Sequence, residues 1–90
     1  MSPTTTVQRV PGLLATEIDG EAVLMHVDQG QYYGLAKTAK AIWDELEQPR
    51  QVNAVCAALA TRYSAPVGVI EADVVRFLGE MRAAGLVDWS

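Results

Sequence analysis

The hydrophobic pattern of the first third of the chain has a period of two. From Leu13 to Leu35, apolar and polar residues alternate, with interruptions at Asp19-Gly20 and at Asp28-Gln29-Gly30. Such alternation is typical of half-buried strands, and steps rich in Asp and Gly are typical of the turns between them. The pattern therefore predicts a meander of three antiparallel strands.

Turn chemistry predicts the register of these strands. A two-residue turn at Asp19-Gly20 pairs the residues on either side of it. For the second turn, a bulge with left-handed Gly30 pairs Met25 with Tyr33, whereas a tight two-residue turn pairs His26 with Tyr33. We favour the bulge because it gathers the larger apolar set on one face. The expected core face is Leu14, Ile18, Val23, Met25, Val27, Tyr33 and Leu35, and the expected outer face is Leu24, His26, Tyr32 and Gly34.

After Leu35 the apolar residues recur at three- and four-residue steps, which predicts helices. The stripes place these helices at about 37–47, 52–63 and 69–84, with Gly85 as the last stop signal. Residues 86–89 are expected to form a short extended tail or strand that folds back onto the helices. The fold class is therefore α+β, a three-stranded antiparallel meander followed by three helices. In the third helix we expect Ile70, Val74, Phe77 and Met81 to face the core.

The chain is long enough for one domain. Its 90 residues are half apolar and carry a net charge of −4. We expect residues 1–9 to be a flexible N-terminal segment and residues 10–90 to be the folded domain. There is no apolar run of the length that spans a bilayer and no hydrophobic signal core, so a cytoplasmic location is expected.

The composition argues against several functions. Seven basic and eleven acidic residues disfavour both nucleic acid and a membrane surface as partners. Cys56 and His26 are the only residues of their kinds, which is too few for a zinc site or a catalytic Cys-His pair with an orienting group. Cys56 lies on an apolar helical stripe and His26 on the expected outer strand face. We therefore expect no catalytic residue, no metal and no cofactor, and predict that the chain is not an enzyme.

Residues 28–35 (Asp-Gln-Gly-Gln-Tyr-Tyr-Gly-Leu), followed by Thr38 and by Ile-Trp-Asp-Glu-Leu at 42–46, resemble the PqqD family, also called RiPP recognition elements. The likeness is strongest to the discrete leader-recognition protein of split lasso-peptide B systems. It covers about residues 13–87. Two positions depart from the family pattern: Ala36 stands where a helix-capping Asn is common, and Ala39 where Gly is frequent. Both positions lie at the entrance of the first helix, and without a capping Asn we expect the helix to lose a side-chain cap, at a cost of about 1 kcal/mol.

The resemblance implies a winged-helix-like fold that binds the leader of a ribosomally made precursor peptide. It also implies that a separate leader peptidase or modifying enzyme acts on the bound precursor. A free edge on the third strand suits this function, because an extended peptide can add there as a further strand. The third helix runs beside that strand in the family. The expected peptide-binding residues are Gln31, Tyr32, Tyr33, Gly34, Leu35, Glu71, Val74, Val75, Leu78, Gly79 and Arg82.

Other functions remain open at this point. The same mode of binding would suit a PqqD-type chaperone for peptide modification by a radical enzyme. A winged-helix DNA-binding regulator is a candidate from another class, but the third helix carries only Arg76 and Arg82 against three acidic residues. The expected oligomeric state is a monomer or a weak homodimer, since a free strand edge can also pair with its own copy.

Overall fold

The order of elements agrees with the α+β prediction and adds one strand before the meander and a short one between the first two helices. A computed structural model describes residues 1–90. The strands are β1 (Thr6–Arg9), β2 (Leu13–Ile18), β3 (Glu21–His26), β4 (Tyr32–Leu35), β5 (Arg50–Gln51) and β6 (Val87–Trp89). The helices are α1 (Lys37–Glu45), α2 (Val52–Tyr63) and α3 (Val67–Ala83). The antiparallel meander followed by three helices is confirmed.

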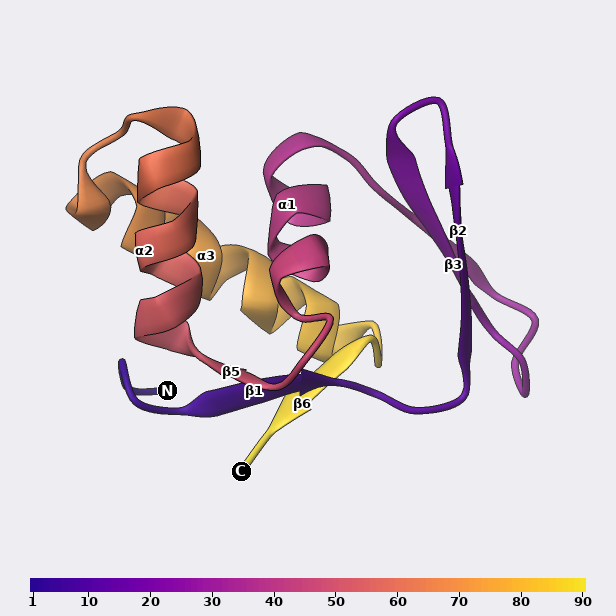
Figure 1. The fold of residues 1–90 in the computed structure, drawn as a ribbon. Coiled ribbons are helices and arrows are strands. Elements are labelled where there is room, and N and C mark those ends of the chain that lie inside the picture. Colours follow the sequence, from indigo (N-terminus) through magenta and orange to yellow (C-terminus); the bar gives the residue numbers. More distant parts are fainter.

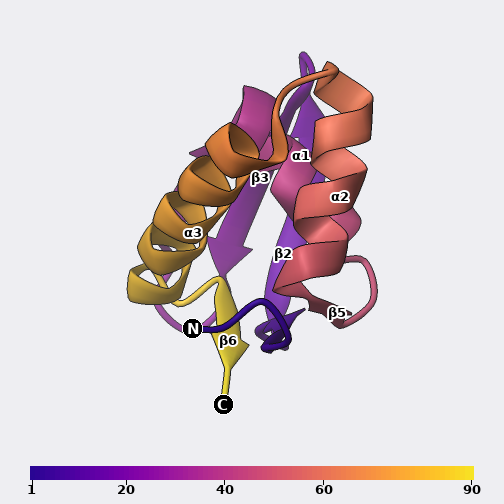
Figure 2. The ribbon, with the colours of Figure 1, turned by 90° about the vertical axis from the view of Figure 1, so that its left-hand side faces the viewer.

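Two sheets border the helices. The meander has the strand order β2-β3-β4, and a second sheet has the order β5-β1-β6. Figure 1 shows the meander at one side of the molecule, with α1 between it and the pair α2 and α3. Figure 2 shows α2 and α3 lying side by side, with β6 below them. One face of the meander therefore packs toward the helices, and no helix or strand covers the other (Figure 1).

The first turn of the meander forms as predicted, and the second does not. Ile18 lies opposite Glu21, across a turn in which both central residues have positive φ. In the second hairpin Leu24 lies opposite Tyr33, so both the favoured bulge and the tight turn are wrong. The loop is longer than either and is closed by hydrogen bonds from Gly30 N to His26 O at 2.7 Å and from His26 N to Gln31 O at 3.1 Å.

This register reverses most of the expected core face. Leu24 is fully buried and Ala22 nearly so, whereas Leu14, Ile18 and Val27 are exposed. Tyr33 and Leu35 do pack toward the core as predicted. The error arises because β3 is apolar on both alternating sets, so periodicity alone does not choose between its faces. We call the uncovered side of the meander the outer face; its apolar members are Leu14, Ile18, Val23, Met25 and Tyr32.

His26 was predicted to lie on the side of the meander that faces away from the core, and this prediction is wrong. Its side chain points to the helix side of the meander, where Nε2 lies 3.0 Å from the carbonyl oxygen of Ala84. Its ring also meets the Tyr33 ring edge to face, with the centroids 5.8 Å apart. A Cβ at Gly85 would lie only 3.0 Å from His26 Nε2. His26 therefore joins the end of β3 to the end of α3.

The helices lie close to their predicted bounds, and their caps are made mostly by backbone. Ala36 provides no side-chain cap to α1, as its identity predicts. Lys37 then has a φ of +53°, which is uncommon for a residue with a Cβ. Helix α2 also lacks a side-chain N-cap, and its first amides are bonded instead by the carbonyls of Thr5 and Pro3 at 3.0 and 2.9 Å. The segment preceding β1 thus completes the start of α2.

The N-terminal segment, which was expected to be flexible, contributes strand β1 to the second sheet. Strand β1 pairs with β5 on one side and with β6 on the other, and Val7 is fully buried. Arg9 closes the contact with α1: its Nη2 donates to the carbonyl oxygen of Trp43, and its guanidinium lies 4.1 Å from the centre of the Trp43 ring. Burial lowers the pKa of this guanidinium. The expected return of residues 86–89 is confirmed as β6, whose partner β1 was missed.

Candidate functional site

Strand β4 forms an open edge of the meander. It pairs with β3 and with no strand on its other side. In an antiparallel ladder, alternate residues bond to the neighbouring strand. Because His26 bonds to Gln31, the same alternation turns the backbone groups of Tyr33 and Leu35 toward β3. The N–H and C=O of Tyr32 and Gly34 consequently point away from the sheet, where an extended peptide could bond to them.

An apolar groove runs along this edge. It has a volume of about 270 Å³ and lies between β4 and the C-terminal half of α3. Its walls are Tyr33, Gly34, Leu35, Ala39, Phe77, Glu80, Met81, Ala84 and Leu86. Side chains of a strand added to β4 would alternate between this groove and the opposite side of the sheet. The site thus combines backbone groups that any peptide can bond with a hollow that selects side chains.

The groove beside β4 has few charged groups. Glu80 is its only charged lining residue. Arg76 lies nearby, with its guanidinium 4.6 Å from the centre of the Phe77 ring, but it forms an ion pair with Asp73 at 3.5 Å. A ligand side chain that enters the groove would therefore meet an apolar floor and one carboxylate.

The meander has a second edge, at β2, which differs in chemistry. The hollow beside it is lined by polar and charged groups as well as by Trp43. Lys40 lies in its lining and forms ion pairs with Asp44 at 2.8 Å and with Glu17 at 3.0 Å. These bonds raise the pKa of Lys40, the larger contribution coming from Asp44. The β2 edge therefore lacks an apolar groove, and β4 is the better candidate site.

The structure places the expected site residues in three different environments. Gln31 to Leu35 lie on or next to the open edge, as predicted. Val74 and Leu78 are fully buried in the core, so they are unavailable to a ligand. The expected helix flank is therefore displaced: Leu78 takes the core position that was predicted for Phe77, and Phe77 is only partly buried.

The remaining flank residues lie away from the groove. Arg82 pairs with Asp88 at 3.2 Å and donates to the carbonyl oxygen of Trp89, so it stabilises β6. A Cβ at Gly79 would meet no atom from outside its own stretch of helix within 4 Å, and Gly79 does not line the groove.

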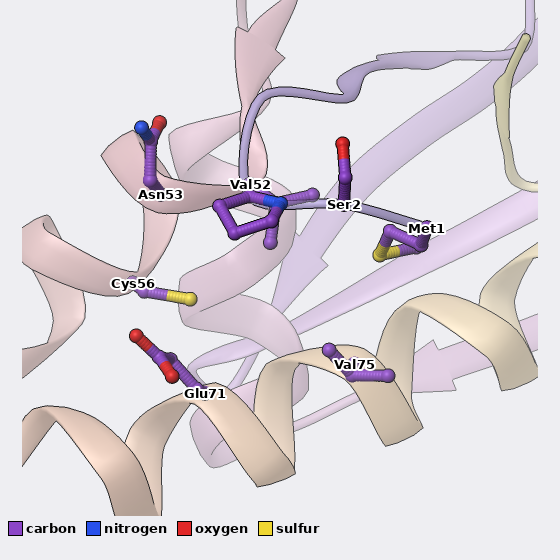
Figure 3. Close-up of a pocket in the computed structure, with 8 residues that line it drawn as sticks. Met1, Ser2, Val52, Asn53, Cys56, Glu71 and Val75 are labelled. Atoms are coloured by element: carbon purple, nitrogen blue, oxygen red, sulfur yellow. The ribbon is translucent and has the colours of Figure 1, made fainter.

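Glu71 and Val75 line a different hollow, shown in Figure 3. It lies between α2 and α3 and has a volume of about 100 Å³. Met1 and Ser2 lie at its border, opposite the α3 side chains (Figure 3). Cys56 also faces it but is buried, and burial, assisted by Glu71, raises the pKa of its thiol. A buried thiol with a raised pKa is a poor nucleophile.

The sequence interpretation missed the groove residues that α3 and its C-cap contribute, namely Phe77, Glu80, Met81 and Ala84. A signal for them existed in the third stripe. Ile70, Val74, Leu78 and Met81 are spaced by four, four and three residues, which gives one continuous core face. Choosing Leu78 over Phe77 for that face would have turned Phe77 and Glu80 toward β4.

No group of three or more His, Cys, Asp and Glu side chains lies together in a way that could hold a metal ion. None of the three helices has the length and apolarity needed to cross a membrane.

Comparisons with known proteins agree with this geometry. The family model described as "Coenzyme PQQ synthesis protein D (PqqD)" matches residues 21–87. Among solved structures, the chain is similar to TbiB1 in complex with the TbiA(beta) leader peptide, with a TM-score of 0.82 and 27% identity over 90% of this chain and 94% of that chain. It has the fold of a lasso peptide synthetase B1 complexed with the leader peptide, with a TM-score of 0.73 and 20% identity over 91% and 96% of the two chains. No curated protein matches the chain.

Proposed function

The chain belongs to the PqqD family, and we propose that it is a recognition element that binds the leader of a ribosomally made precursor peptide. The leader adds as a strand to the free edge of β4 and places side chains in the groove against α3. The observation that carries this proposal is the open β4 edge beside an apolar hollow. The similarity to TbiB1, a protein solved with a leader peptide, supports it.

The edge supplies affinity and the groove supplies selectivity. Backbone bonds to Tyr32 and Gly34 are independent of the leader's sequence, whereas the groove prefers an aliphatic or aromatic side chain near Phe77. Glu80 favours a leader residue that carries a positive charge or a hydroxyl group. We propose the contact residues Gln31, Tyr32, Tyr33, Gly34, Leu35, Phe77, Glu80 and Ala84.

The chain itself performs no chemistry in this proposal. A separate leader peptidase or modifying enzyme acts on the bound precursor, and the chain raises the local concentration of substrate for it. A cytoplasmic location and a monomeric or weakly dimeric state complete the proposal. A lasso-peptide pathway is supported by the similarity to TbiB1, and a cofactor pathway of the PQQ type would use the same groove.

The test is a titration of the leader encoded beside this chain, fluorescently labelled, against the purified protein. We expect saturable binding with a Kd of tens of micromolar or tighter. Single N-methylation along the leader should then give an alternating pattern, because only every second amide of an added strand faces β4. Absence of binding, or equal binding of all N-methylated leaders, would contradict the proposal.

A further inference from the structure

The outer face of the meander is an apolar surface that the fold leaves bare. Leu14 and Ile18 are each 56% exposed and Tyr32 is 70% exposed, whereas most large apolar side chains of the helices are buried. Val23 and Met25 lie between them, and a hollow of about 260 Å³ is lined by Leu14, Val23, Met25 and Tyr32. Contiguous exposed apolar groups of this kind are typical of interaction sites.

The meander itself carries carboxylates and no Lys or Arg. From Val10 to Ala36 the chain has no Lys or Arg but has four carboxylates, Glu17, Asp19, Glu21 and Asp28. The remaining seven acidic residues balance the seven basic ones, so the net charge of −4 resides entirely in the meander. Only Glu17 has an ion-pair partner, Lys40. The other three stand at the two ends of the hairpins, next to the bare apolar surface.

The excess of carboxylates on the meander favours one kind of binding partner for the outer face over another. A second copy on the outer face would bring two sets of carboxylates together, which opposes self-association through this surface. A partner with an apolar centre and a Lys- or Arg-rich border would meet complementary charge instead. The outer face is also continuous with the β4 edge, so a protein seated on it would lie next to a peptide added there.

We propose that the outer face is the docking surface for the enzyme that processes the bound precursor, and that this enzyme presents an apolar patch bordered by basic residues. This inference rests on the proposed leader binding. It adds that one sheet has two functions: its edge holds the peptide, and its outer face holds the enzyme. The partner would contact both the sheet and the outward-facing side chains of the added leader strand.

The experiment measures the affinity of this protein for the purified leader peptidase or modifying enzyme encoded beside it, by biolayer interferometry with and without leader. Leu14→Asp places a charge in the apolar hollow of the outer face, on the strand farthest from β4. We expect it to weaken enzyme binding at least tenfold and to leave leader affinity within twofold. Val69→Asp is the matched control, because Val69 is 58% exposed on α3 and should change neither affinity.

A second variant tests the charge argument without altering the apolar surface. Glu21→Lys should slow enzyme association and reduce its dependence on salt. Docking on this face is overturned if neither variant changes enzyme affinity by more than twofold, or if sedimentation shows the wild-type protein to be a dimer that Leu14→Asp dissociates. If the wild-type protein binds no leader, the proposed function fails, and enzyme binding measured without leader still tests the docking surface.

Discussion

The two edges of the meander are alike in backbone and opposite in surroundings. Both β2 and β4 pair with β3 on one side only, so each presents unpaired N–H and C=O groups. Beside β4 lies an apolar groove, whereas beside β2 Lys40 forms ion pairs with Glu17 and Asp44. The comparison teaches that an open edge alone is a nonspecific site. Selective peptide binding requires a side-chain pocket in register with the edge.

The largest expected effect is on the edge itself. Gly34→Pro removes an N–H that points away from β3, and we expect it to weaken leader binding by about tenfold or more, equivalent to roughly 1.4 kcal/mol. Gly34→Ala should bind normally, because its Cβ would meet only Glu21 Oε1 at 3.6 Å. The measurement is leader titration by fluorescence anisotropy.

The matched control for Gly34→Pro lies on the other edge. The register of the first hairpin makes Ala15 the equivalent outward-facing position of β2, so Ala15→Pro deletes an edge donor there. Leader affinity should stay within twofold. If Ala15→Pro weakens binding as much as Gly34→Pro does, the leader uses the β2 edge or the proline effect is not local, and the comparison of edges breaks down.

A smaller effect is expected at the groove. Phe77→Ala should weaken leader binding by about fivefold, roughly 1 kcal/mol, because it removes the only aromatic side chain that α3 contributes to the groove. Val75→Ala is the control: Val75 is 48% exposed on the same helix but lines the hollow of Figure 3. Equal losses for the two variants would show that the leader covers a different side of α3.

The smallest effect is expected at the β2 edge. Lys40→Met removes both ion pairs and makes the hollow beside β2 more apolar. We expect leader affinity at β4 to change by less than twofold, since Lys40 does not line that groove. A second leader bound per chain, detected as stoichiometry by calorimetry, would sharpen the comparison by showing that the ion pairs alone keep the β2 edge free of peptide.

The sequence predicted most of the fold because turn residues, helix stop residues and apolar periodicity act locally along the chain. Asp19-Gly20 predicted the first turn and its register, Gly85 marked the end of the last helix, and the apolar stripes predicted three helices. The second hairpin was mispredicted because its loop is longer than either turn that was considered. A one-residue change in register exchanges the two faces of a strand, and β3 offers apolar residues on both.

The strand side of the candidate site was predicted from the sequence, and the helix side was not. The edge residues 31–35 follow from strand order, which the sequence indicated. The helix side of the groove depends on the rotation of α3 about its axis, and Phe77 and Leu78 are adjacent apolar residues that compete for one core position. Strands β1 and β5 were missed because they are short, and because β1 pairs with segments more than forty residues away in sequence.

The sequence by itself determined the order of strands and helices, the identity of the edge strand at residues 32–35 and the acidic character of the meander. These features depend on local periodicity, on turn residues and on the charges along the chain. Only the tertiary structure decided which face of the meander is covered, which side of α3 borders the groove and that the N-terminal segment completes the second sheet. These features depend on which of two comparably apolar surfaces packs against the rest of the chain. That choice is made by packing between segments that are distant in sequence.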